Sequence, residues 1–321
     1  MYARSSIRVA AAALTTVLLA HTGAQAAAPF VGTQAPGYYR MKLGDFEVTA
    51  LTDGTLMLPV SNLLTNVGGP ELQQALARSF LKEPVPTSVN GFLVNTGAKL
   101  VLIDTGTGEL TDPKIGNLVA NLRASGYQPE QVDEVYITHM HGDHIGGLAV
   151  DGRATFANAI VRADKREADY WLSQANLNAA DKNAKGRFEG AQKDLAPYIA
   201  AGRFKTFDGA TDLVAGLRSL PGYGHTPGHS MYMVESKGEK LLLWGDLMQV
   251  GAVQFSDPAV TIRFDSDSKE AAAQRQKVFA EAASQRYWVG GAHIAFPGLG
   301  HVIKAGDAYA WVPVNYPQPP P

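Results

Sequence analysis

The sequence predicts one α/β domain in which two mixed β-sheets pack together and the helices lie outside them. Strand-like apolar runs cluster in both halves of the chain, with helical patterns between them. No low-complexity linker separates the halves, and 45% hydrophobic with 18% charged residues and 33 glycines suits a large core with many strand-to-loop turns.

The positions of the expected elements follow from periodicity and from the residues that flank each run. Strands are expected near residues 44–52, 89–95, 99–104, 132–138, 158–163, 217–221, 231–236, 240–246 and 287–292. Helices are expected at about 114–125, 164–175, 187–201 and 268–286. The proline-rich residues 317–321 predict an extended tail.

Residues 1–26 are predicted to be a signal peptide, which leaves residues 27–321 as the folded domain. Arg4 and Arg8 give a positive start, Val9–Ala20 is a short apolar stretch, and Ala24–Ala26 has the small-x-small pattern of a cleavage site. The apolar stretch is too short for a permanent membrane span, although an uncleaved anchor is the alternative. We therefore expect cleavage near Ala26, export to the periplasm or beyond, and no stable membrane anchor.

Net charge and cysteine content bear on the partners and on the compartment of the protein. The formal net charge of −2 gives no electrostatic reason to expect nucleic acid as a partner. The chain has no cysteine, so it can depend on no disulfide in an oxidising compartment.

The segment from Thr138 to His144 contains four metal-capable side chains with the spacing His-x-His-x-Asp-His. An apolar run, Val132–Ile137, leads into it and predicts a strand that ends where the histidines begin. Alternate residues of an extended chain share a face, so His139 and His141 should point to one side. The following turn should bring Asp143 and His144 close. Four such ligands can serve two metal ions, and the alternative is a polar loop with unrelated histidines.

Two ligand pairs do not complete two metal sites, so further ligands are expected downstream. His225 lies in a loop held by Pro227 and Gly228, while Asp246 and His293 each end an apolar strand-like run. Strand ends gathered along one sheet edge are where α/β proteins usually build sites, which favours these three residues. The alternatives are that His225 caps a turn and that His301 replaces His293. His229 is expected to be structural.

Two aspartates could orient the ligand histidines, because ligating imidazoles commonly donate their other N–H to a carboxylate. Asp104 and Asp53 each end an apolar strand. The alternative for both is an ordinary turn aspartate.

The order of these residues resembles that of the metallo-β-lactamase-fold hydrolases. From Gly37 through Val314 the chain is similar to the methyl parathion hydrolase branch of that superfamily, with matching stretches at Gly44–Leu51, Tyr127–Glu134 and Phe296–His301. The resemblance implies the αβ/βα sandwich fold and formation of a homodimer. It also implies two metal sites, one holding His139, His141 and His225, the other Asp143, His144 and His293, with Asp246 bridging both. The β-lactam-hydrolysing relatives have a cysteine where this chain has Asp246, so antibiotic hydrolysis is disfavoured.

The expected cofactors are two zinc ions per chain, with manganese, cobalt or iron as alternatives. A hydroxide that bridges two metals would attack a substrate whose P=O, P=S or C=O oxygen is polarised by one of them, and Asp246 could donate a proton to a poor leaving group. The resemblance places Trp171, Phe188, Thr111 and Gln249 in the substrate pocket. Thr111 stands where the methyl parathion hydrolases have an aromatic residue, and plain helix packing is the alternative for Trp171 and Phe188.

Three functions compete at this point. The first is hydrolysis of organophosphorus triesters such as methyl parathion or paraoxon. The second is a lactonase or arylesterase, including quorum-quenching hydrolysis of acyl-homoserine lactones, in which triester cleavage is incidental. The third is a metal-dependent redox protein with iron in the sites, which is disfavoured because the full His/Asp set is present and no extra cofactor domain is visible. In the first two cases the partner is a small apolar ester, phosphotriester or lactone.

Overall fold

The computed structural model describes residues 28–108 and 114–316. The expected signal peptide, Thr111 and the proline-rich tail lie outside the described residues. The chain divides into two units, Met1–Ala35 and Pro36–Pro321, and every described helix and strand belongs to the second unit.

The first sheet has seven strands in the order β1-β2-β4-β5-β6-β9-β10. The pairs β1–β2, β2–β4 and β4–β5 are antiparallel. The pairs β5–β6, β6–β9 and β9–β10 are parallel. The strands are β1 Tyr38–Leu43, β2 Phe46–Leu58, β4 Val85–Asn95, β5 Leu100–Ile103, β6 Glu134–Tyr136, β9 Ile160–Asp164 and β10 Phe204–Phe207.

The second sheet also has seven strands, in the order β11-β12-β13-β14-β16-β17-β18. Only β14 and β16 pair parallel within it. The strands are β11 Asp212–Val214, β12 Leu217–Pro221, β13 Ser230–Ser236, β14 Glu239–Leu243, β16 Trp288–Gly290, β17 Leu299–Ala305 and β18 Ala308–Pro313. Two short pairs complete the strands: β3 Leu64–Thr65 with β15 Thr261–Ile262, and β7 Ala149–Val150 with β8 Arg153–Ala154.

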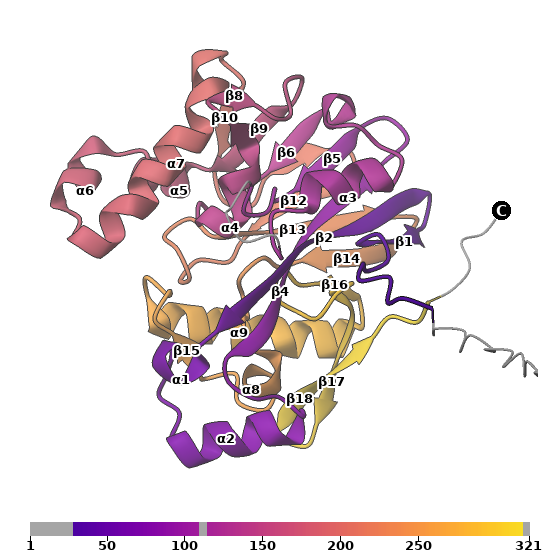
Figure 1. Ribbon diagram of the computed structural model, residues 1–321, viewed down its shortest axis with the longest axis vertical. Helices are drawn as coiled ribbons and strands as arrows, with labels where there is room; N and C mark the ends of the chain where they lie inside the picture. The colour runs from indigo at the N-terminus through magenta and orange to yellow at the C-terminus, as the bar shows by residue number, and fades with distance from the viewer. Residues whose placement is uncertain (1–27, 109–113, 317–321) are drawn as a thin grey trace, which may run out of the picture. The chain divides into compact units, whose positions relative to one another are not determined.

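Helices α3, α5 and α7 lie on the outer face of the first sheet and α9 lies along the second, whereas α6 projects away from the sheets (Figure 1). Their ends follow local sequence signals: Asp164 caps α5 through the Arg166 N–H, and Asp267 caps α9 through the Glu270 N–H. The helices are α1 Val60–Leu63, α2 Gly69–Arg78, α3 Leu118–Ala124, α4 Gly142–Ile145, α5 Lys165–Trp171, α6 Gln174–Ala179, α7 Lys182–Ala200, α8 Gly251–Gln254 and α9 Ser268–Gln285, with 3-10 turns η1 Pro129–Gln131 and η2 Gly146–Leu148.

The central strands of both sheets carry apolar residues on both faces. On β5, Leu102 packs under the helices of the first sheet, while Val101 and Ile103 face the second sheet. On β14, Leu241 and Leu243 face the first sheet and Leu242 packs toward α9. Successive strand residues point to opposite faces, so each strand needs apolar residues at every position to sit between two layers. The result is helices, sheet, sheet and helices, which confirms the expected four-layer arrangement.

The expected strands and helices all have counterparts, but their boundaries differ. The run near 44–52 is interrupted at its start, because Gly44 adopts a φ of +55° in the β1–β2 turn, where a Cβ would lie 2.4 Å from the carbonyl oxygen of Ser236. Sequence reasoning missed β17 and the sheet-edge strands β1, β10, β11 and β18. β1 does alternate, with every second residue buried, whereas β10, β11 and β18 bury few residues and therefore carry little apolar signal. None of the helices in the described part of the chain is both long and apolar enough to cross a membrane.

Candidate metal centre

The seven predicted ligands meet where strands of both sheets end. His139, His141, Asp143 and His144 follow β6, and Asp246 and His293 follow the parallel strands β14 and β16. His225 lies in the connection between β12 and β13. Parallel strands direct their carboxyl ends to one edge, so residues far apart in sequence converge there.

The four ligand residues of the motif have different local conformations. His139 is fully buried after the strand, and His141 is the extended N-cap residue of α4, a single helical turn. Asp143 and His144 lie on that turn, and their ligand atoms fall in a different group from those of His139 and His141. The spacing therefore splits the motif into two pairs, as expected from the sequence.

The potential ligand atoms form two groups, each within 4.8 Å. In the first group the Nδ1 atom of His141 lies 3.0 Å from His139 Nε2 and 3.1 Å from His225 Nε2. In the second group Asp143 Oδ2 lies 3.6 Å from His144 Nε2 and 3.5 Å from His293 Nε2. His301, the alternative to His293, belongs to neither group; it stacks on Trp288 and contacts the Tyr287 carbonyl.

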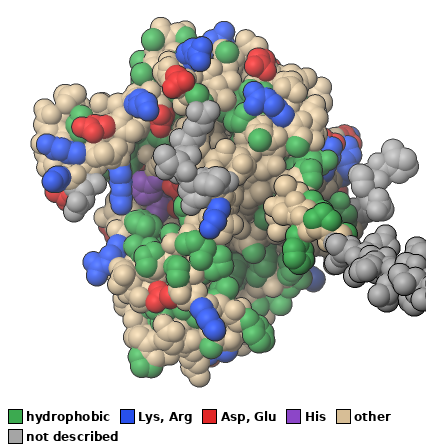
Figure 2. Space-filling view, viewed as in Figure 1, with side chains coloured by type: hydrophobic (Ala, Val, Ile, Leu, Met, Phe, Trp, Pro, Cys, Tyr) green, Lys and Arg blue, Asp and Glu red, His purple; other side chains and the backbone are tan. Residues whose placement is uncertain are grey.

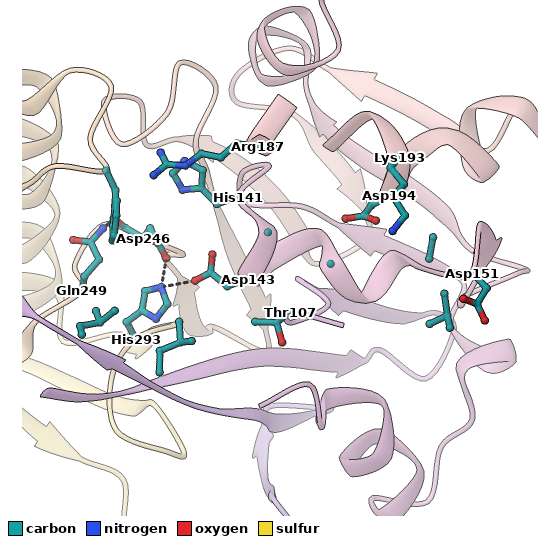
Figure 3. A pocket seen from close by; sticks show the side chains of 17 residues that line it. Thr107, His141, Asp143, Asp151, Arg187, Lys193, Asp194, Asp246, Gln249 and His293 are labelled. Carbon is teal, nitrogen blue, oxygen red and sulfur yellow. Dashed lines mark hydrogen bonds and ion pairs between the residues drawn. The ribbon is translucent and has the colours of Figure 1, made fainter. Parts of the chain in front are cut away.

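Asp246 lies between the two groups and turns one carboxylate oxygen toward each. Its Oδ2 lies 3.3 Å from His225 Nε2 and 3.8 Å from His139 Nε2. Its Oδ1 lies 3.0 Å from His293 Nε2 and 3.1 Å from His144 Nε2, and Figure 3 shows the contact to His293 together with that from His293 to Asp143. This is the arrangement of a carboxylate that can hold two cations at once.

The chemistry of these atoms fits metal ions. Three imidazole nitrogens of the first group face one another at contact distance, and their lone pairs repel unless a cation lies between them. His144 Nε2 and Asp246 Oδ1, which lie 3.1 Å apart, are both buried without a hydrogen-bond partner among the described residues. Buried polar atoms rarely lack partners, and imidazole with carboxylate ligands suits zinc and similar ions.

Four of the five ligand histidines have a neighbour at Nδ1, whereas His141 turns its own Nδ1 toward the first group. His144 donates from Nδ1 to Asp104 Oδ2 over 2.8 Å, and His139 Nδ1 lies 3.1 Å from Thr138 Oγ1, which donates to the same Asp104 oxygen. His293 donates from Nδ1 to the Ser88 carbonyl over 2.8 Å. These contacts hold Nε2 of each ring free for a cation. Asp104 thus orients two histidines, from a left-handed backbone conformation with φ +58°.

Sequence reasoning missed Asp265, which accepts the Nδ1 proton of His225 over 2.8 Å. Its side chain is fully buried and also accepts the Ile262 N–H. It follows no recognisable strand and belongs to no spaced motif, so nothing in the sequence distinguished it.

Asp53 does not orient a histidine as expected. Its carboxylate accepts hydrogen bonds from the Thr107 N–H and hydroxyl and from the backbone N–H groups of Gly116 and Leu118. Both oxygens are therefore used in holding Thr107, which follows β5, and the residues at the start of α3. This corrects the sequence-based hypothesis, and the physical reason is that the left-handed turn after β5 carries Thr107 back onto Asp53.

Glu167 was also missed, although it ties together the two loops that carry the first group. Its Oε1 accepts the Met140 N–H and the Trp171 Nε1–H, both over 2.8 Å. Its Oε2 accepts the Thr226 hydroxyl and the Gly228 N–H at 2.7 and 2.9 Å. The side chain is fully buried, and burial raises the pKa of Glu167 while the four hydrogen bonds oppose that effect.

His229 positions Asp246 through the backbone. Its Nδ1 donates to the Gly222 carbonyl over 2.9 Å, so its Nε2 is free to accept the Asp246 N–H over 3.0 Å. Burial lowers the pKa of His229 to about 3, which keeps this acceptor neutral. Gly245 is required beside it, because a Cβ there would lie 2.7 Å from Nε2 at a φ of +54°.

Burial and the two aspartates dominate the electrostatics of the ligands. Burial lowers the pKa of His139 and of His141 well below the ordinary value. Against the same burial, Asp246 and Asp265 raise the pKa of His225 to about 9, and Asp246 raises the pKa of His144 and His293. Because a histidine must be deprotonated at the nitrogen that binds a metal, metal affinity is expected to rise with pH.

A cavity of about 590 Å³ opens onto the cluster, and Figure 2 shows a histidine in a hollow of the surface. Leu56, Leu58 and Phe264 give it an apolar wall, and Gln249 lines it as expected. Trp171 and Phe188 do not line it. They are buried in the core with their rings 4.7 Å apart, and Trp171 packs edge-on behind His141. This corrects the pocket prediction for both residues.

Gln249 contacts the cluster from the cavity wall. Its amide nitrogen donates to the Asp246 carbonyl over 2.8 Å and lies 3.3 Å from His225 Nδ1. Its Oε1 is buried and has no hydrogen-bond partner within the described residues.

Comparisons with known proteins agree with this fold. A family model described as "Metallo-beta-lactamase superfamily" matches residues 84–303. The solved structure titled "Crystal structure of hydrolase AbOPH in beta lactamase superfamily" is 37% identical, with a TM-score of 0.84 over 89% of this chain and 100% of that one. AidC, a dizinc quorum-quenching lactonase solved with its product N-hexanoyl-L-homoserine, is 26% identical, with a TM-score of 0.81 over 88% of this chain and 99% of that one.

Among curated proteins the matches are partial. An N-acyl homoserine lactonase from Bacillus cereus is 26% identical over 163 residues, which is 50% of this chain and 56% of that protein. A beta-lactamase-like protein 2 homolog from Caenorhabditis elegans is 28% identical over 192 residues, or 58% of this chain and 55% of that protein. The chain thus spans about half the length of these curated relatives.

Proposed function

This chain belongs to the metallo-beta-lactamase superfamily and is a metal-dependent hydrolase, and we propose that it is a two-zinc lactonase whose substrates carry an apolar acyl chain. The observation that carries the proposal is the position of Asp246. Its two oxygens face two separate ligand groups at the end of a cavity with an apolar wall.

The seven residues of the two groups would hold the metals. His139, His141 and His225 would bind one ion, Asp143, His144 and His293 the other, and Asp246 both. When bound, such ions lower the pKa of water and polarise the carbonyl oxygen of a substrate.

The chain itself supplies position and environment. Asp104, Asp265 and the Ser88 carbonyl fix the ring orientations, and the buried ligands exclude bulk water from one side of the cluster. Leu56, Leu58 and Phe264 offer apolar contact for an acyl chain. Opening a lactone also requires a proton at the leaving oxygen, and the carboxyl group of Asp246 is the candidate donor at that position.

Two observations favour a lactone over an organophosphorus triester. An aryl leaving group gains from aromatic walls, whereas Trp171 and Phe188 lie in the core. Similar proteins include lactonases from two comparisons. Triester hydrolysis stays the second candidate, because the apolar wall of Leu56 and Leu58 would also accept a nitrophenyl group.

The test compares three substrates on one zinc-loaded preparation. We expect kcat/KM to be highest for N-hexanoyl-homoserine lactone, intermediate for dihydrocoumarin and lowest for methyl paraoxon. The matched control is the same preparation stripped with chelator, which should lose activity on all three. A kcat/KM for methyl paraoxon above those for both lactones would overturn the proposal in favour of the triester function.

A further inference from the structure

The charged residues of the cavity form two groups, one at each end. Figure 3 shows Arg187 alongside His141, at the end that holds Asp143, Asp246 and His293. Lys193, Asp194 and Asp151 lie at the other end. A positive side chain thus lies where metal ions would already concentrate positive charge.

Arg187 makes no ion pair with any of the described residues. It lies on the exposed side of α7, and its guanidinium lies 5.6 Å from the ring centroid of Phe264, which also lines the cavity. This contact orients the side chain while leaving its N–H donors unused. An arginine held at a cavity wall with free donors is suited to a ligand that supplies acceptors.

Like charges at short range repel, so an arginine beside two divalent cations is unfavourable unless an anion lies between them. The same arrangement strengthens binding of an anion, because both sides attract it. A planar carboxylate matches the two parallel N–H groups of a guanidinium, which a neutral ester cannot do equally well.

We infer that Arg187 forms an anion subsite that binds the carboxylate of the ring-opened hydroxy acid. The inference rests on the proposed lactonase function, and deepens it. In lactone hydrolysis the oxygen of water bonds to the carbonyl carbon, the ring C–O bond breaks, and the leaving oxygen takes a proton. The new carboxylic acid loses its proton to the solvent. The substrate is neutral and the product is an anion, so this subsite favours the product and makes its release slower.

The test measures binding of N-hexanoyl-homoserine and of its neutral amide by calorimetry to the zinc-loaded protein. Arg187→Met keeps the stem against Phe264 and removes the charge, whereas Arg187→Lys keeps a charge without the planar pair of donors. Lys185→Met, also on α7 and exposed but absent from the cavity lining, is the matched control for lost charge. We expect Arg187→Met to weaken the hydroxy acid about tenfold, the range of a charge-assisted hydrogen bond, with a smaller loss in Arg187→Lys. The amide should bind all four proteins equally.

An equal effect of Arg187→Met on the acid and the amide, or an equal loss of acid binding in Lys185→Met, would refute the subsite. If diethyl phosphate depends on Arg187 and the hydroxy acid does not, the carboxylate assignment is overturned. The outcome is separable from the proposed function. Arg187-dependent acid binding in a protein that opens no lactone would refute the lactonase alone, and lactone hydrolysis without that dependence would refute the subsite alone.

Discussion

Replacing Glu167 with glutamine tests how the first ligand group is held. The carboxylate accepts four hydrogen bonds, two on each oxygen. An amide has one oxygen and one NH₂ group, so it can satisfy only one of these pairs of donors. Met140 N–H and Trp171 Nε1–H can only donate, whereas the Thr226 hydroxyl can turn and accept. We therefore expect the amide oxygen to remain with Met140 and Trp171, and the NH₂ group to face Thr226 and Gly228.

The magnitude follows from this orientation. The Gly228 N–H is left buried without an acceptor, which costs roughly 1–3 kcal/mol. The hydrogen bonds from Met140 and Trp171 become weaker, because their acceptor is no longer charged. This loss is partly offset, because the variant no longer buries a negative charge. We expect Glu167→Gln to lower the free energy of unfolding by about 2 kcal/mol in chelator. The disturbance is centred on the loop of His225, so the first metal group should weaken while the second keeps its affinity.

The assay combines urea unfolding in chelator with zinc titration against a chromophoric competitor. Glu134→Gln is the matched control, because Glu134 is also buried but pairs with Arg162 away from the ligands. The control should lose stability with both zinc affinities unchanged. Equal weakening of both zinc sites in Glu167→Gln, or no change in either, would refute the reasoning that Glu167 acts through the His225 loop.

Three further outcomes are expected. The purified protein should hold close to two metal ions per chain. Chelator should abolish its activity, and zinc, cobalt or manganese should restore it. Elemental analysis that returns one ion per chain in active enzyme would contradict the two-site assignment. Asp246→Ala should lose both ions and turnover, whereas His301→Ala should retain both by elemental analysis. Burial raises the pKa of Asp194 to about 6, so folding favours its proton and stability falls as pH rises through that value. In urea unfolding with chelator at pH 8, the free energy of unfolding of Asp194→Asn should exceed that of the native protein by about 1 kcal/mol, a value reduced for the partial exposure of Asp194. Below pH 4 the two free energies should be equal.

The ligands could be predicted because their signals are local. His139 to His144 lie within one short segment, and Asp246 and His293 each follow a strand whose apolar run is visible in the sequence. Strand ends then meet at one edge by topology alone. The residues that fix these ligands have no such signal: Asp265 is 40 residues from the histidine it orients, and only the folded chain brings the two together.

Trp171 shows why the cavity wall could not be predicted in the same way. Helical spacing indicates which residues share a face of α5, and it does not decide whether that face meets the core or a cavity. Here Glu167, one turn earlier, accepts the indole N–H and draws the ring into the core behind His141. Glu167 in turn is held by Met140, Thr226 and Gly228, which belong to the loops of His139, His141 and His225. The network that positions the first ligand group is therefore the same one that removes an aromatic wall from the cavity. It follows that replacing Glu167 should alter metal affinity and substrate preference together, whereas replacing a residue of the apolar wall such as Leu56 should alter preference alone.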